Sequence, residues 1–271
     1  MGVISLAVRN VARGHVDLEA YLDGVTIRSV DDIYSAAEVL RDFAAQCDLR
    51  VALCADISDK KAMVDADGNA LAETLFGWSN SRSRWWQKCC LGLDSPLALA
   101  CRYEGEPFWT NADGFHGPFD NPYLAAIDLR KWYVNNAVGQ SAIVVPVQLP
   151  FSQISANSFH PIESSVDDLT ETFEWVGGML GAITRRFIIG YVAAIRKKRR
   201  IPAGCQLSKR EVECLRWAAV GKTDLEIGMI LHLSHGTVRY HVKRAGEKLE
   251  SINRTQTIFK AGQLGFLGAN S

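Results

Sequence analysis

Two basic side chains, Arg239 and Lys243, stand four residues apart near the end of the chain, and this spacing places both on one face of a helix. Guanidinium and ammonium groups can contact phosphates and donate hydrogen bonds to base edges. Apolar residues of the same stretch recur at spacings of four, three and four and predict a buried stripe: Val238, Val242, Ala245 and Leu249. The pattern is that of a helix seated in the major groove of DNA.

The helices that must position this basic face carry their own start signals. Ser208 and Thr223 each precede a glutamate by three residues, Glu211 and Glu226, so each pair can form a reciprocal capping box. In a capping box, the hydroxyl and the carboxylate each accept a hydrogen bond from a backbone N–H group at the helix start. Helices are therefore predicted to begin after residues 208 and 223.

A tight turn is predicted to lead into the basic helix. Gly221 stands where the first helix must end in a left-handed residue, and Ser234 can cap a third helix after a turn at His232 and Leu233. A solvated basic face would carry the same charges as a DNA-binding one. Two capping boxes and a turn in register favour the DNA-binding interpretation.

With these signals, residues 207–267 resemble the four-helix DNA-binding domain of the LuxR-type quorum-sensing regulators. Glu211, Leu215 and Gly221 stand on the family's most recurrent positions, and Lys248-Leu249 stands on its usual Lys-Leu pair. The resemblance implies a transcriptional regulator that binds double-stranded promoter DNA.

The resemblance also implies roles for individual residues. Arg239 and Lys243 would face bases, and the last helix, about 255–264, would help to pair two such domains. Phosphates would lie near three further residues: Ser234, Thr237 and Arg244.

The charge of the chain is divided between its two ends. The 271 residues hold 30 basic and 30 acidic side chains, but residues 196–271 have fifteen of the basic and six of the acidic ones, a net charge of +9. The remainder has a net charge of −9. A basic end gains DNA affinity through counterion release, whereas an acidic remainder is repelled by phosphates and suits another task. The length and 48% apolar content fit two packed domains.

The seven cysteines indicate no metal site. They include no Cys-x-x-Cys motif and no histidines at zinc spacing, and the odd count among apolar neighbours favours a reduced, cytoplasmic protein. We expect no metal and no cofactor other than a small-molecule ligand. No run approaches the roughly twenty apolar residues of a membrane span, so no membrane partner is expected.

A boundary is predicted at residues 196–204, where five consecutive basic residues precede Pro202 and Gly204. Basic residues complement the dipole at a helix C-terminus, and proline and glycine stop the helix. The expected organisation is a sensing and dimerisation domain over residues 1–195, a linker over 196–204 and a helix-turn-helix domain over 205–271. Contact of the basic run with the DNA backbone is an additional possibility.

The first domain mixes helical and strand patterns. Helices are predicted over 29–47 and 166–195, and strands over four stretches: 50–57, 97–103, 141–149 and 151–158. Helices before, between and after strands predict an α+β domain, an α-β-α sandwich with a mostly antiparallel sheet, joined to the small all-α domain. The stretch 65–69 lacks the glycine and glutamate positions of a calcium loop, and it predicts a turn.

Asp94 among aromatic residues is the strongest indication of chemistry in the first domain. A carboxylate among apolar rings needs donors and an indole N–H needs an acceptor, so a neutral ligand with an amide and a carbonyl can satisfy both. The family resemblance implies that Asp94 accepts the amide N–H of an acyl-homoserine lactone. Trp109, fifteen residues later, would donate to the lactone carbonyl. The tryptophans of this region are equally compatible with ordinary core packing.

The ligand positions depart from the family pattern. Trp85 replaces a tyrosine nine residues before Asp94, Ser81 replaces a tryptophan, and Ala142 replaces a glycine before the strand proline. Ser158 falls where a hydroxyl residue helps to hold the ligand amide. Loss of the tyrosine hydroxyl removes a donor worth about 1–3 kcal/mol, enough to change ligand preference tenfold or more.

Three classes of function remain open at this point. The leading hypothesis is a homodimeric transcription factor controlled by a small signal molecule, an acyl-homoserine lactone or a related non-standard signal. The alternative is an orphan regulator without a ligand, which acts by heterodimerisation with another family member or by its sequestration. An enzyme would need a nucleophile and a base, for which only Cys89, Cys90 and His116 are candidates, and no nucleophile motif surrounds them.

Overall fold

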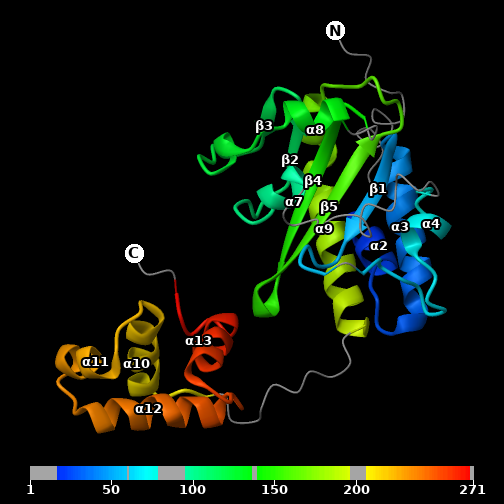
Figure 1. Ribbon diagram of the computed structural model, residues 1–271. Coiled ribbons are helices and arrows are strands. Elements are labelled where there is room, and N and C mark those ends of the chain that lie inside the picture. Colours follow the sequence, from blue (N-terminus) through cyan, green and yellow to red (C-terminus); the bar gives the residue numbers. More distant parts are fainter. Residues whose placement is uncertain (1–16, 60, 79–94, 136–138, 196–205, 269–271) are drawn as a thin grey trace. The chain divides into compact units, whose positions relative to one another are not determined.

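A computed structural model describes residues 17–59, 61–78, 95–135, 139–195 and 206–268. Contacts divide the chain into two compact units, one formed mainly by residues up to 197 and the other mainly by residues from 198 onward (Figure 1). The linker predicted over 196–204 lies outside the described residues.

The first unit is built on a five-stranded antiparallel sheet with the strand order β1-β5-β4-β2-β3. The bounds are β1 Leu49–Cys54, β2 Phe108–Asn111, β3 Gly114–His116, β4 Ser141–Leu149 and β5 Gln153–Pro161. The register pairs Ile143 with Phe159 between β4 and β5, and with Trp109 between β4 and β2. Because successive side chains alternate between the two faces, this register decides which residues can meet.

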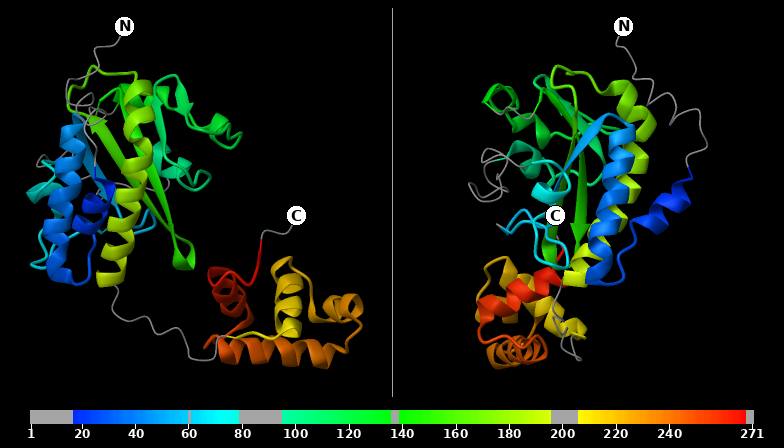
Figure 2. Two further views of the ribbon diagram at one scale, coloured as in Figure 1. Left: turned by 180° about the vertical axis from the view of Figure 1, so that it is seen from behind. Right: turned by 90° about the vertical axis from the view of Figure 1, so that its right-hand side faces the viewer.

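Helices cover both faces of the sheet (Figure 2). The α-helices are α2 Leu18–Gly24, α3 Ile33–Gln46, α4 Leu71–Thr74, α7 Pro96–Ala100, α8 Arg130–Asn135 and α9 Thr170–Ile195. Helices α3 and α9 share a core with Ile143 and Phe159, whereas α7 shares a second core with Ala142 and Val144. This arrangement is the predicted mixed fold of helices and antiparallel sheet.

Helix α9 packs against α3 and one face of the sheet in the core of the first unit. It has 26 residues and is long and apolar enough, by composition alone, to cross a membrane. Its buried side chains instead pack in the core beside α3 and the sheet, among them Leu180, Ile183 and Phe187. A buried core helix passes the same test of length and composition. Gly190 brings α9 close to Ile27, since a Cβ there would lie 3.0 Å from that side chain.

One predicted strand is wrong, and two strands are additional to the prediction. Residues 97–103, predicted as a strand, begin with helix α7, because the Ser95 hydroxyl caps the Ala98 N–H and Pro96 occupies the first helical turn. The short hairpin of β2 and β3 has no long alternating pattern. The strands predicted over 50–57, 141–149 and 151–158 correspond to β1, β4 and β5. Residues 65–69 form the predicted turn, with two backbone N–H groups donating to Asp65.

Within residues 206–268, the second unit has four helices, α10 Lys209–Ala219, α11 Asp224–Leu231, α12 His235–Lys248 and α13 Arg254–Gln263. Both predicted capping boxes are present at Ser208 and Thr223. Gly221 has a φ of +94°, the left-handed conformation that its position requires. These local interactions begin and end the helices where the spacing of residues predicts.

The Glu211 carboxylate connects the beginning of α10 to the end of α12. Its Oε2 accepts the Ser208 N–H at 2.7 Å and pairs with Lys248 Nζ at 2.7 Å, although Glu211 is only 4% exposed. Burial raises the pKa of Glu211, but the hydrogen bonds from Lys248 and Ser208 outweigh it and leave the pKa below its ordinary value. Because a buried charge without partners is costly, this pairing holds the two helices in one arrangement.

Replacement of Glu211 by glutamine should lower the free energy of unfolding of the second unit by about 1–3 kcal/mol, because the ion pair of the buried carboxylate with Lys248 is lost. Because the folded-state pKa is lowered, the stabilisation is complete above the ordinary value of 4.5 and disappears as pH falls through the folded value. Denaturant unfolding of the full chain at neutral and acidic pH measures both effects. Glu247→Gln, which removes an exposed pair with Arg244, serves as the control and should cost less than about 1 kcal/mol. Equal losses of unfolding free energy in the two variants would show that the pair of Glu211 with Lys248 contributes no more than an exposed pair.

Candidate nucleic-acid interface and cavity

Helix α12 presents one buried face and one basic face. The predicted stripe is buried, with Val238 and Ala245 fully covered and Val242 and Leu249 at 8% and 2% exposure. Arg239 and Lys243 are exposed, and neither forms a salt bridge with another residue in the described part of the chain. A basic face without internal partners is available for a negatively charged surface.

Two of the predicted phosphate contacts lie at the N-terminus of α12. Ser234 Oγ accepts the Thr237 N–H at 3.1 Å, and the two hydroxyls are 2.8 Å apart. A helix N-terminus favours anions, because its first N–H groups lack partners and its dipole is positive there. The third predicted contact, Arg244, pairs with Glu247 one turn later at 3.0 Å.

The turn before α12 depends on a close approach of backbone to backbone. The Leu233 N–H donates to the Gly228 carbonyl at 2.8 Å, and a Cβ on Gly228 would lie 2.6 Å from the Leu233 carbonyl oxygen. His232 adopts the left-handed conformation with a φ of 55°. The turn between α11 and α12 therefore requires glycine at position 228, because a side chain there would collide with the backbone of Leu233.

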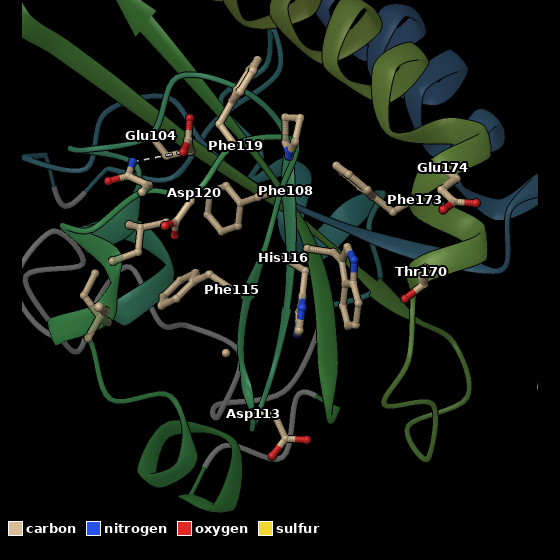
Figure 3. A pocket seen from close by; sticks show the side chains of 18 residues that line it. Glu104, Phe108, Asp113, Phe115, His116, Phe119, Asp120, Thr170, Phe173 and Glu174 are labelled. Carbon is tan, nitrogen blue, oxygen red and sulfur yellow. Dashed lines mark hydrogen bonds between the residues drawn. The ribbon is translucent and has the colours of Figure 1, made fainter.

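A cavity of about 840 Å³ lies beside the hairpin of β2 and β3 in the first unit (Figure 3). Aromatic side chains line it, namely Phe108, Trp109, Phe115, Phe119 and Phe173. The Trp109 and His116 rings stack with centroids 3.9 Å apart, and His116 Nε2 lies 3.3 Å from Asn111 Oδ1. This volume is within the range of small-molecule sites.

The predicted ligand residues that the structure describes do not gather at one point. Trp85 and Asp94 lie outside the described residues. Trp109 lines the cavity and belongs to the core on the α9 face of the sheet. Ala142 pairs with Thr110, the neighbour of Trp109 in β2, and Ser158 pairs with Val144, so both lie on the opposite face. The sheet separates Trp109 from Ala142 and Ser158.

Sequence reasoning missed a buried histidine on the face of Ser158. His160 is 5% exposed, and its Nε2 lies 2.9 Å from Ser158 Oγ. Burial and then the nearby Arg50 charge lower the pKa of His160 to about 4, so its imidazole is neutral near pH 7. Ser158 and His160 are two residues apart in β5, so the alternation of side chains places both on one face, and the pairing of β1 with β5 brings Arg50 opposite His160.

The cysteines that the structure describes are buried free thiols: Cys47, Cys54, Cys101 and Cys214. Burial raises the pKa of Cys47 and of Cys54 to about 12, which suppresses the reactive thiolate. The candidates Cys89 and Cys90 lie outside the described residues. Within the described residues, no group of three or more His, Cys, Asp or Glu is placed to hold a metal ion.

Comparison with known proteins identifies relatives of the second unit. Residues 205–261 match the family model described as bacterial regulatory proteins, luxR family. A putative HTH-type transcriptional regulator of Sinorhizobium fredii is 33% identical over 129 residues, 47% of this chain and 37% of the relative. The quorum sensing-dependent regulator RpaR of Rhodopseudomonas palustris is 45% identical over 62 residues, 23% of this chain and 26% of the relative. The chain therefore spans less than two fifths of the length of either relative.

One solved structure is similar over most of the length of the chain. SdiA in complex with octanoyl-rac-glycerol matches with a TM-score of 0.50 at 17% identity, over 93% of this chain and 96% of that one. At this identity the similarity concerns the fold, and it agrees with the mixed first unit and the helical second unit. The matching family consists of transcriptional regulators and not of enzymes.

Replacement of Gly228 by alanine should destabilise the second unit by about 1–3 kcal/mol, because the new methyl group meets the Leu233 carbonyl oxygen. Gly262→Ala in α13 is a matched control, since no atom lies within 4 Å of its Cβ position, and alanine favours the helix. Thermal unfolding of the two full-length variants compares them. An unchanged midpoint for Gly228→Ala would show that the turn accommodates a side chain.

Proposed function

Since residues 205–261 form a helix-turn-helix domain of the luxR family of bacterial regulatory proteins, we propose that this chain is a cytoplasmic transcriptional regulator that binds promoter DNA as a dimer. The observation that carries the proposal is the basic face of α12, where Arg239 and Lys243 are exposed without salt-bridge partners among the described residues. Arg239 and Lys243 contact base edges in the major groove. Ser234, Thr237 and Arg244 contact phosphates and position the helix.

Dimerisation has support in exposed apolar side chains on two helices. On α9, Trp175 and Ile189 are 54% and 49% exposed and lie on one face, fourteen residues apart. On α13, Phe259 is 62% exposed. A symmetric dimer buries such residues and presents two copies of α12 about 34 Å apart to a palindromic site.

A small signal molecule controls this dimer in our proposal, an acyl-homoserine lactone or a related non-standard signal. The described cavity, with Trp109 in its lining, supports a ligand in the first unit. Trp85, Asp94, Ala142 and Ser158 are further proposed contacts. A ligand that binds the folded chain alone stabilises it by mass action and thereby raises the concentration of DNA-binding dimer.

One observation favours a second candidate function. The sheet places Ala142 and Ser158 on the face opposite Trp109, so one ligand in contact with all three side chains would have to extend around the edge of the sheet. A regulator without a ligand, which pairs with another family member or sequesters it, is compatible with this arrangement.

Replacement of Arg239 by alanine should weaken binding to the preferred DNA site by about 1–3 kcal/mol and relax the choice of base at one position. Selection of bound sequences from a random pool, followed by affinity measurements at fixed salt, tests this. Arg216→Ala removes the same charge from an exposed position of α10 and is the control. A uniform loss across all sequences would reassign Arg239 to a phosphate contact.

Ligand control is tested by purification of the full chain from cells grown with and without a host extract, followed by mass spectrometry of what remains bound. We expect soluble, DNA-binding protein only when a small molecule copurifies. Soluble protein that binds DNA without any ligand would contradict ligand control. A second regulator found in stoichiometric amount would instead support heterodimerisation.

A further inference from the structure

The charge of the cavity beside β2 and β3 has one sign. Its lining contains four carboxylates, Glu104, Asp113, Asp120 and Glu174, and no lysine or arginine among the residues that the structure describes there. Such a lining repels anions and attracts cations. Its charge therefore favours a cationic over an anionic ligand.

Two of these carboxylates have partners within the protein. Glu104 accepts hydrogen bonds from the Gly105 and Glu106 N–H groups and from the Asn121 side chain. Asp113 lies 3.8 Å from Arg130, and both side chains are largely exposed. In contrast, Asp120 and Glu174 form no salt bridge with a described residue, and they enter the cavity lining from a loop and from α9 respectively.

The aromatic walls suit the same kind of ligand. Phe115, Phe119 and Phe173 lie around the space together with the stack of Trp109 and His116 (Figure 3). Phe119 is 72% exposed, so its ring is accessible to a ligand. Aromatic faces attract ammonium groups through cation–π interactions, and they also accept apolar or aromatic bodies.

We propose that this cavity binds an organic cation, an ammonium group carried on an aromatic or alkyl body. The ammonium group lies near Asp120 or Glu174, and the apolar body packs among Phe115, Phe119 and Phe173. This inference rests on the proposed function, in that it names the chemical class of the signal molecule. It selects a positively charged signal over a neutral lactone.

Three probes of matched shape and different charge test the inference on the full chain by isothermal titration calorimetry: 2-phenylethylammonium, 2-phenylethanol and phenylacetate. We expect the cation to bind about tenfold more tightly than the alcohol, and phenylacetate to bind most weakly. Added salt should weaken only the cation's binding. No binding of the cation, equal binding of the three probes, or a preference for phenylacetate would overturn the inference.

Charge variants locate the site. Asp120→Asn combined with Glu174→Gln should reduce the affinity for 2-phenylethylammonium about tenfold and leave the alcohol unchanged. Glu171→Gln removes one negative charge from α9 outside the cavity lining, half the charge change of the double variant, and should have little effect. An equal loss with Glu171→Gln would assign the effect to the general negative charge of the domain and overturn the proposed site. Thermal unfolding verifies that all variants are folded.

Measurement of DNA affinity with and without each probe separates this inference from the proposed function. Tight cation binding without any change in DNA affinity would contradict ligand control and leave the cation site intact. A response of DNA affinity to the alcohol in the absence of cation binding would support ligand control and overturn the cation site.

Discussion

The ion pair between Glu211 and Lys248 determines how the second unit presents its basic face. The Glu211 carboxylate caps the beginning of α10 and neutralises a lysine at the end of α12, and it does so at 4% exposure. Removal of Lys248 would leave the Glu211 charge in an environment that solvates it poorly. Arg239 and Lys243 are exposed on α12, and the C-terminal end of this helix is therefore fixed to α10 by the pair of Lys248 with Glu211. The close approach of Gly228 to the Leu233 carbonyl fixes the turn before the N-terminal end of α12.

The first unit is governed by a different constraint, the alternation of side chains across its sheet. Trp109 and Ile143 are directly paired and face α9, whereas Ala142 and Val144 face α7. A ligand site on this sheet consequently belongs to one face or extends around its edge. The cavity lies beside the edge hairpin, where residues of β2 and β3 meet the beginning of α9. Its acidic lining agrees with the net negative charge of residues 1–195. The end of the chain that is proposed to bind DNA has the opposite charge.

Much of the second unit was predictable from the sequence, because its determinants are local. Capping boxes join residues three apart, the left-handed Gly221 terminates its own helix, and the stripe of Val238 and Val242 follows the helical period. The first unit was less predictable. Residues 97–103 have the composition of a strand, but Ser95 and Pro96 begin a helix there. The strands β2 and β3 are too short to show an alternating pattern, and they are stabilised by the pairing of β2 with β4 and of β3 with β2.

The sequence by itself determined the helix-turn-helix, its basic face, the division of charge and the mixed α+β class, since each depends on near neighbours or on composition. The tertiary structure alone decided that Lys248 is the partner of Glu211, that Trp109 and Ala142 lie on opposite faces, and that Asp120, Phe173 and Glu174 line one cavity. These residues are far apart in the chain or differ only in strand register. A change of register by one residue reverses which face a side chain occupies, and the sequence of a single strand does not specify its partner.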